Sequence, residues 1–93
     1  MTSPVDLVLY ARPGCHLCEE AREAIQIALE ERAAQGLPNP HLVERNIETD
    51  DEWHRAYLER IPVVELGDRR LELYVSVAKL RRILSDELDR TVV

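Results

Sequence analysis

Two cysteines separated by two residues are the side chains of this sequence best suited to chemistry. Cys15 and Cys18 follow an apolar run and a Pro13-Gly14 turn, and the residues after them have a helical pattern. At the first turn of a helix, unpaired backbone N–H groups and the positive end of the helix dipole favour a thiolate. The sequence holds no other cysteine, so none remains for a structural disulfide elsewhere. This arrangement predicts a redox-active pair.

The charged neighbours of Cys15 decide how strongly its thiolate is favoured. Arg12 and protonated His16 stabilise a thiolate, whereas Glu19 and Glu20 repel it. We therefore expect the pKa of Cys15 to lie moderately below the ~8.5 of a free thiol. Because an imidazole changes charge near physiological pH, His16 is also a candidate for tuning the redox potential.

The expected reaction is thiol–disulfide exchange. The Cys15 thiolate attacks a substrate disulfide, and Cys18 attacks the resulting mixed disulfide and releases the product. Cys15 is therefore the expected nucleophile, and Cys18, one turn further along the helix, is the expected resolving thiol.

Two other uses of the cysteines are open. Both fit the apolar stripe of the helix, where they would be inert core residues. A Cys-x-x-Cys pair is also half of a zinc site, with His16, His41 or His54 as conceivable further ligands, or a bridge to a metal or cluster in a dimer. The sequence contains no second Cys-x-x-Cys and no paired-histidine motif. We therefore predict no metal.

Length and composition narrow the class of protein. The 93 residues predict one domain over 1–93, and the hydrophobic fraction of 45% is enough for a folded core. The net charge of −6 argues against nucleic acid as a partner. No basic residue precedes the first apolar run, and no apolar run approaches the ~20 residues that cross a bilayer. We expect a cytoplasmic protein without membrane contact, in whose reducing surroundings cysteines are poor structural links.

The hydrophobic pattern predicts seven elements. We expect strands at 5–10, 41–47, 61–66 and 70–75, with a hairpin turn at Gly67-Asp68. A long helix runs from His16 and closes at Gly36; a short one, capped by Thr49 or Asp50, runs to residue 57; a last one follows an N-cap at Ser76 and runs to 88. The order β-α-β-α-β-β-α predicts an α/β fold with a four-stranded mixed sheet and helices on both faces.

The remaining aromatic and charged side chains are expected to be structural or solvated. The face shared by Trp53, Ala56 and Tyr57 should pack on the sheet, and Tyr10 and Tyr74 should belong to the framework. We expect the other charged candidates to lie on solvated faces: His54, Arg69, Arg70, Arg81 and Arg82.

Two segments, 9–18 and 60–64, resemble the glutaredoxin-like family of the thioredoxin fold. They read LYARPGCHLC and RIPVV, and the likeness in element order extends from about Val5 to Leu88. The resemblance implies that the Ile61-Pro62 bond is cis, that Pro62 faces the cysteines, and that the backbone at Ile61-Pro62 holds an extended substrate. Arg12 matches a basic residue of the family.

The sequence departs from that family in two places. His16-Leu17 stands where glutaredoxins typically have Pro-Tyr, and residues 73–77 (LYVSV) lack the Gly-Gly that helps glutaredoxins hold glutathione. The resemblance therefore implies no bound cofactor here, with glutathione serving at most as a reductant.

The function predicted from these observations is that of a dithiol–disulfide oxidoreductase. Its expected substrate is a disulfide-containing protein or a small thiol compound, and its expected reductant is glutathione or a thioredoxin-type protein. The alternative is a binding module of the same fold, whose thiols hold a partner or metal without turnover.

Overall fold

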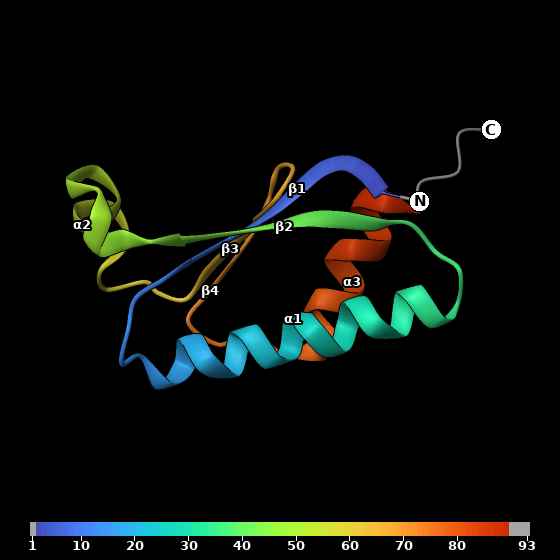
Figure 1. The fold of residues 1–93 in the computed structure, drawn as a ribbon, viewed down its shortest axis with the longest axis horizontal. Coiled ribbons are helices and arrows are strands. Elements are labelled where there is room, and N and C mark those ends of the chain that lie inside the picture. Colours follow the sequence, from blue (N-terminus) through green and yellow to red (C-terminus); the bar gives the residue numbers. More distant parts are fainter. Residues whose placement is uncertain (1, 90–93) are drawn as a thin grey trace.

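The computed structural model describes residues 2–89 of the chain, with side chains from Val5 onward. Four strands, three α-helices and a short 3-10 helix follow one another in the predicted order (Figure 1). Their bounds are β1 Thr2–Ala11, α1 His16–Ala34, β2 Asn39–Asn46, η1 Ile47–Thr49, α2 Asp51–Tyr57, β3 Val63–Leu66, β4 Arg69–Glu72 and α3 Val77–Leu88.

The four strands form one mixed sheet in the order β2-β1-β3-β4. β1 and β2 are parallel, because α1 carries the chain back between them. β3 runs antiparallel to β1, with Tyr10 opposite Val63, and a turn at Gly67 returns the chain as β4. This register places the end of β1 and the beginning of β3 at the same end of the sheet.

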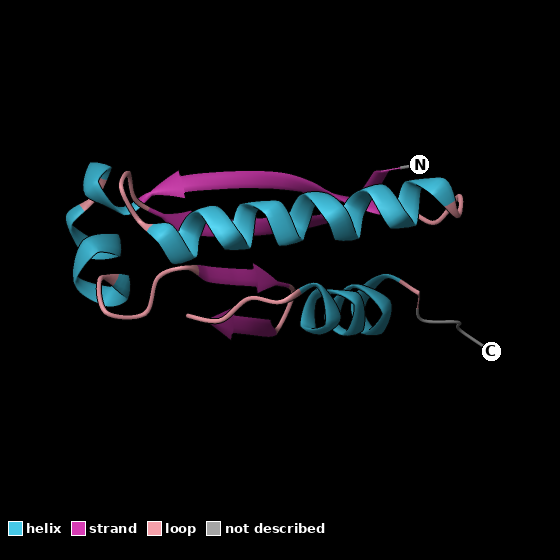
Figure 2. Ribbon diagram, turned by 90° about the horizontal axis from the view of Figure 1, so that it is seen from below, coloured by secondary structure: helices cyan, strands magenta, loops and turns pink. Residues whose placement is uncertain are grey.

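One face of the sheet is covered by α1 and α3 (Figures 1 and 2). Leu7 and Leu9 of β1 point to this face and are at most 1% exposed. They pack with fully buried side chains of both helices, such as Ile25 and Leu80. Burying one such side chain contributes about 1.5–3 kcal/mol, so this face supplies most of the core.

The opposite face carries a cluster of aromatic and cationic side chains beside α2. The rings of Tyr57 and Trp53 lie 4.4 and 5.9 Å from that of Tyr10. The guanidinium of Arg45 stands over the Tyr10 and Trp53 rings and donates to the Tyr10 hydroxyl at 2.9 Å. Ala56 is exposed, so the expectation that it packs on the sheet is wrong; α2 contacts the sheet through its two aromatic residues.

Local chemistry decides where the helices begin. Asp50, one of the two predicted caps, accepts hydrogen bonds from the N–H groups of Glu52 and Trp53 at the start of α2. Ser76 caps α3 as predicted, through the N–H of Lys79. These side chains satisfy backbone donors that a helix leaves unpaired at its N-terminus.

Three further predicted details are wrong. Ile47 belongs to η1 and is fully buried, so β2 ends one residue earlier than expected. β4 ends at Glu72 because Leu73 has a φ of 63°, which takes the backbone out of the extended conformation. Tyr74 is 69% exposed and is not part of the framework, whereas Tyr10 is buried as predicted.

A partly buried ion pair joins the C-terminal ends of α1 and α3. Arg32 is 7% exposed and donates to both carboxylate oxygens of Asp89, at 2.6 and 3.0 Å, and to the Pro38 carbonyl. The hydrogen bonds from Arg32 hold the pKa of Asp89 below its ordinary value. Arg69, Arg70, Arg81 and Arg82 are exposed, as predicted.

Over residues 2–89, the protein has no helix whose length and apolar content would let it cross a bilayer.

Candidate active site

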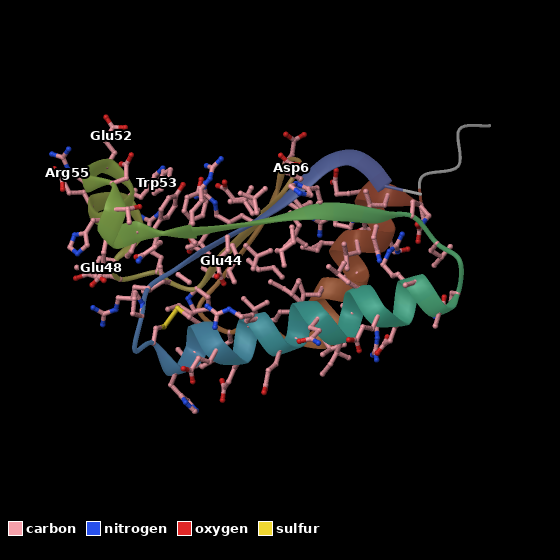
Figure 3. The ribbon with its side chains drawn as sticks, in the orientation of Figure 1. Asp6, Glu44, Glu48, Glu52, Trp53 and Arg55 are labelled. Atoms are coloured by element: carbon pink, nitrogen blue, oxygen red, sulfur yellow. A yellow bond between two sulfur atoms is a disulfide. The ribbon has the colours of Figure 1, made fainter. Side chains whose placement is uncertain are left out.

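The two cysteines lie at the junction between β1 and α1 (Figure 3). Cys15 is the N-cap of α1, with extended backbone, and its Sγ accepts a hydrogen bond of 3.1 Å from the Cys18 N–H. The two residues form a disulfide, with Cα atoms 5.2 Å apart. A sulfur therefore occupies the position that a capping oxygen takes in most helices.

The two sulfur-bearing side chains differ in exposure. Cys18 is 1% exposed and belongs to the core cluster, while Cys15 is partly exposed at its edge. The two cysteines are therefore not both inert core residues. A molecule arriving from solvent meets Cys15 first.

The turn before the motif depends on Gly14. Its φ is 73°, in the left-handed region that side chains disfavour, although a Cβ at this position would meet no atom within 4 Å. The requirement at this position is therefore conformational. With Pro13 before it, Gly14 turns the chain sharply enough to bring Cys15 to the helix terminus.

Arg12 and His16, the predicted thiolate-stabilising residues, are both exposed. His16 Nε2 lies 3.3 Å from Glu20 Oε1, one turn along α1. Arg12 lines a pocket of about 240 Å³ on the β2 side of the motif, together with Glu19. Within the described residues, neither side chain makes a hydrogen bond or ion pair with Cys15. Their predicted role remains a hypothesis about longer-range electrostatics.

Ile61 and Pro62 lie at the same end of the sheet as the cysteines. The bond between them is cis, and Pro62 directly precedes β3. Tyr10 is opposite Val63 in the antiparallel β1–β3 pair. Pro62, the residue before Val63, therefore lies beside the end of β1, and the chain continues from that end to the cysteine motif. Both residues are buried.

Hydrogen bonds within the protein already occupy most of the backbone at Ile61-Pro62. The Ile61 N–H donates to the Tyr57 carbonyl at 2.9 Å, and the Pro62 carbonyl accepts from Leu73 N–H at 2.9 Å. Of the polar backbone groups of this pair, the Ile61 carbonyl oxygen is the one without a partner among the described residues. If this segment holds an extended substrate, it does so as an acceptor.

Sequence reasoning considered the connection between β4 and α3 only for glutathione binding, and missed the pocket that it forms with α1. Leu73, Tyr74, Val75 and Ser76 line a pocket of about 200 Å³ together with Leu17 and Glu20 from the first turns of α1. The sequence feature noted for this segment was the absence of glycine in residues 73–77, which indicated only that it lacks the usual glutathione-binding glycines.

The described residues contain no group of three or more His, Cys, Asp or Glu side chains placed to hold a metal ion. His41 instead lies 3.7 Å from Asp6, at the β1–β2 pair. Residues 2–89 thus offer no ligand set for the single-chain zinc site considered as an alternative.

The strand order and the dithiol at the start of the first helix together define a thioredoxin-fold protein with a Cys-x-x-Cys motif. The chain belongs to the glutaredoxin-like domain family (DUF836), whose family model matches residues 6–92. The predicted family and fold class are thereby confirmed. Among curated proteins, none matches the chain.

Solved structures support the same fold. A malarial protein has a TM-score of 0.68 at 13% identity, with 92% of this chain and 99% of that chain covered. Protein Ne2328 from Nitrosomonas europaea has a TM-score of 0.62 at 26% identity, with coverages of 96% and 92%. The germline-specific thioredoxin Deadhead from Drosophila melanogaster has a TM-score of 0.57 at 14% identity, with coverages of 88% and 79%.

Proposed function

We propose that this protein is a dithiol–disulfide oxidoreductase in which Cys15 is the nucleophile and Cys18 the resolving thiol. The observation that carries the proposal is the unequal exposure of a bonded cysteine pair at a helix N-terminus. Outer and inner thiols of this kind suit the two successive steps of exchange, because the second thiol must act only after the first has reacted.

In the first step, the Cys15 thiolate attacks one sulfur of a substrate disulfide and the other sulfur leaves as a thiolate. In the second step, Cys18 loses its proton to solvent and attacks Cys15 Sγ, which releases the second substrate thiolate. The leaving thiolates take protons from water. The substrate gains two electrons, and the protein loses two as its disulfide forms.

A reductant must then restore the dithiol. We propose glutathione or a thioredoxin-type protein for this step, acting in a reducing compartment such as the cytoplasm. Structural disulfides are rare there, and transient catalytic ones are the usual form. No bound cofactor is needed for this cycle, because the electrons pass between sulfur atoms.

The proposal is tested with Cys15→Ser and Cys18→Ser variants. With hydroxyethyl disulfide as substrate, and glutathione or thioredoxin with its reductase as electron source, Cys15→Ser should have no activity. Reduced beforehand and mixed with substrate without added reductant, Cys18→Ser should instead accumulate a mixed disulfide with the substrate, detected by mass spectrometry. A wild-type protein that forms the disulfide but turns over no substrate with either reductant would contradict the proposal and favour a binding module.

A further inference from the structure

An apolar surface lies directly beside the cysteine motif. It consists of the half-buried Leu17 and the exposed Leu73 and Tyr74, which we call the apolar platform. Leu17 is located between the two cysteines in the sequence, and all three residues line one pocket. Leu73 is 39% and Tyr74 69% exposed. Exposed apolar side chains that form one contiguous patch mark interaction sites, whereas single scattered ones do not.

The backbone conformation of Leu73 indicates that its exposed side chain has a role other than stabilising the fold. Its φ of 63° lies in the left-handed region, which is unfavourable for a residue with a Cβ. Its N–H is held by the carbonyls of Arg60 and Pro62, at 3.2 and 2.9 Å. Glycine would adopt this conformation without strain. The chain thus carries a strained leucine whose side chain is partly in water, and stability of the fold does not account for that choice.

The charged side chains near the apolar platform limit which substrates can bind to it. Glu20 lines the same pocket, and the nearby Lys79 ammonium donates to the Tyr74 carbonyl at 3.1 Å. Glutathione disulfide carries more carboxylates than amines, so Glu20 disfavours it. Lys79 is not among the residues that line the pocket, whereas Glu20 is the one charged residue that lines it within residues 2–89 and also lies 3.3 Å from His16 Nε2. A polypeptide segment that pairs an apolar side chain with a lysine or arginine is therefore complementary to both the platform and Glu20.

We propose that the substrate is the disulfide of an extended polypeptide whose cysteine is flanked by an apolar and a basic residue. The apolar side chain packs on the apolar platform, and a backbone N–H of the same segment donates to the unpaired Ile61 carbonyl oxygen. This inference rests on the proposed function and uses the same exchange reaction. It assigns to Leu73 and Tyr74 a role in substrate selection.

The test uses pre-reduced protein in single-turnover reactions, so that no external reductant is needed. Two synthetic peptides of equal length each carry one cysteine linked by a disulfide to thionitrobenzoate, flanked by Leu and Lys in one and by Ser and Glu in the other. Attack on the peptide sulfur releases coloured thionitrobenzoate. Partial burial of one leucine side chain should make the Leu–Lys peptide react about tenfold faster.

The variants Leu73→Gly and Tyr74→Ser should lose most of this preference. Leu73→Gly should be at least as stable as wild type, because glycine relieves the backbone strain; a thermal melt checks that lost selectivity is not lost folding. Ile27→Ser removes an apolar residue of α1 that is similarly exposed, at 46%, and should keep the preference.

Each outcome decides something different. Equal rates for the two peptides, a preference that survives in both platform variants, or faster reaction with the mixed disulfide of glutathione and thionitrobenzoate would overturn the inference while leaving the oxidoreductase proposal intact. Failure to release thionitrobenzoate from either peptide would contradict the proposed function itself, and the platform with it.

Discussion

At the scale of single residues, the site depends on the hydrogen bond between the N-terminus of α1 and the sulfur atom of Cys15. Cys15 Sγ accepts the Cys18 N–H in the disulfide form, at 3.1 Å. The same donor remains available when the disulfide is reduced, since it belongs to the backbone. A hydrogen bond to the charged form lowers the pKa of an acid, so this contact favours the Cys15 thiolate independently of Arg12 and His16.

We predict that the pKa of Cys15 lies below the ~8.5 of a free thiol. The measurement is the rate of iodoacetamide alkylation against pH in the Cys18→Ser variant, where Cys15 is the only thiol. Adding Glu19→Gln to that variant should lower the pKa further, because it removes a carboxylate in the first turn of α1. Glu23→Gln, one turn further from the terminus, serves as control and should change the pKa less.

A pKa at or above the free value would show that the helix terminus does not activate Cys15. In that case the exchange reaction would need another base, and the described residues show none in contact with Cys15.

At the scale of elements, helix starts were predictable and long-range contacts were not. Asp50, Ser76 and the N-terminal position of Cys15 follow from side chains that bond to backbone two or three residues away. Such chemistry is visible in a short window of sequence. Arg32 and Asp89 are 57 residues apart, and only the packing of α1 against α3 brings them together.

The misjudged parts of the site have the same physical origin. The pattern of alternating residues continues past Glu72, so it predicts a longer strand than β4. The strand stops at Leu73 because its φ of 63° takes the backbone out of the extended conformation, although its N–H still donates to the Pro62 carbonyl. A leucine in the left-handed region has no signature in its own sequence neighbourhood, since local propensity argues against it.

We predict that Asp89→Asn destabilises the protein by about 1–2 kcal/mol at neutral pH, since it weakens charge-assisted hydrogen bonds to the buried Arg32. Urea unfolding measures the difference. Asp86→Asn is the control: its pair with Arg69 is exposed, and the cost should be less than about 1 kcal/mol.

The same pair predicts a pH dependence. Because Arg32 lowers the pKa of Asp89, the unfolded chain binds more protons near pH 4 than the folded protein does. The pair's contribution is therefore complete above about pH 4 and is lost as the pH falls through the lowered pKa. The gap in stability between wild type and Asp89→Asn should close on acidification; a gap that persists at low pH would contradict this assignment.

At the scale of the whole molecule, the two faces of the sheet are stabilised differently. α1 and α3 bury one face almost completely, whereas α2 has no buried residue of its own. α2 reaches the sheet through Trp53 and Tyr57. Figure 3 shows Trp53 and the disulfide at the same end of the sheet, where Pro62 precedes β3. The site therefore borders the less buried part of the fold.

The prediction of one domain over 1–93 requires that α2 unfold together with the other helices and the sheet. Trp53 is the chain's one tryptophan and lies in α2, against Tyr10 and Arg45, so its fluorescence reports on that end. Far-UV circular dichroism reports mainly on α1 and α3, which are longer. The Tyr57 carbonyl receives the Ile61 N–H, which ties α2 to the start of β3.

We therefore predict that urea unfolding gives the same midpoint by Trp53 fluorescence and by circular dichroism, as a two-state domain requires. Tyr10→Ala should lower both midpoints together, because it removes the ring on which α2 packs and leaves a cavity costing about 3–5 kcal/mol. A fluorescence transition at lower urea than the circular dichroism transition would mean that α2 opens independently. The substrate surface beside Ile61 would then be formed and lost while the core of the protein remains folded.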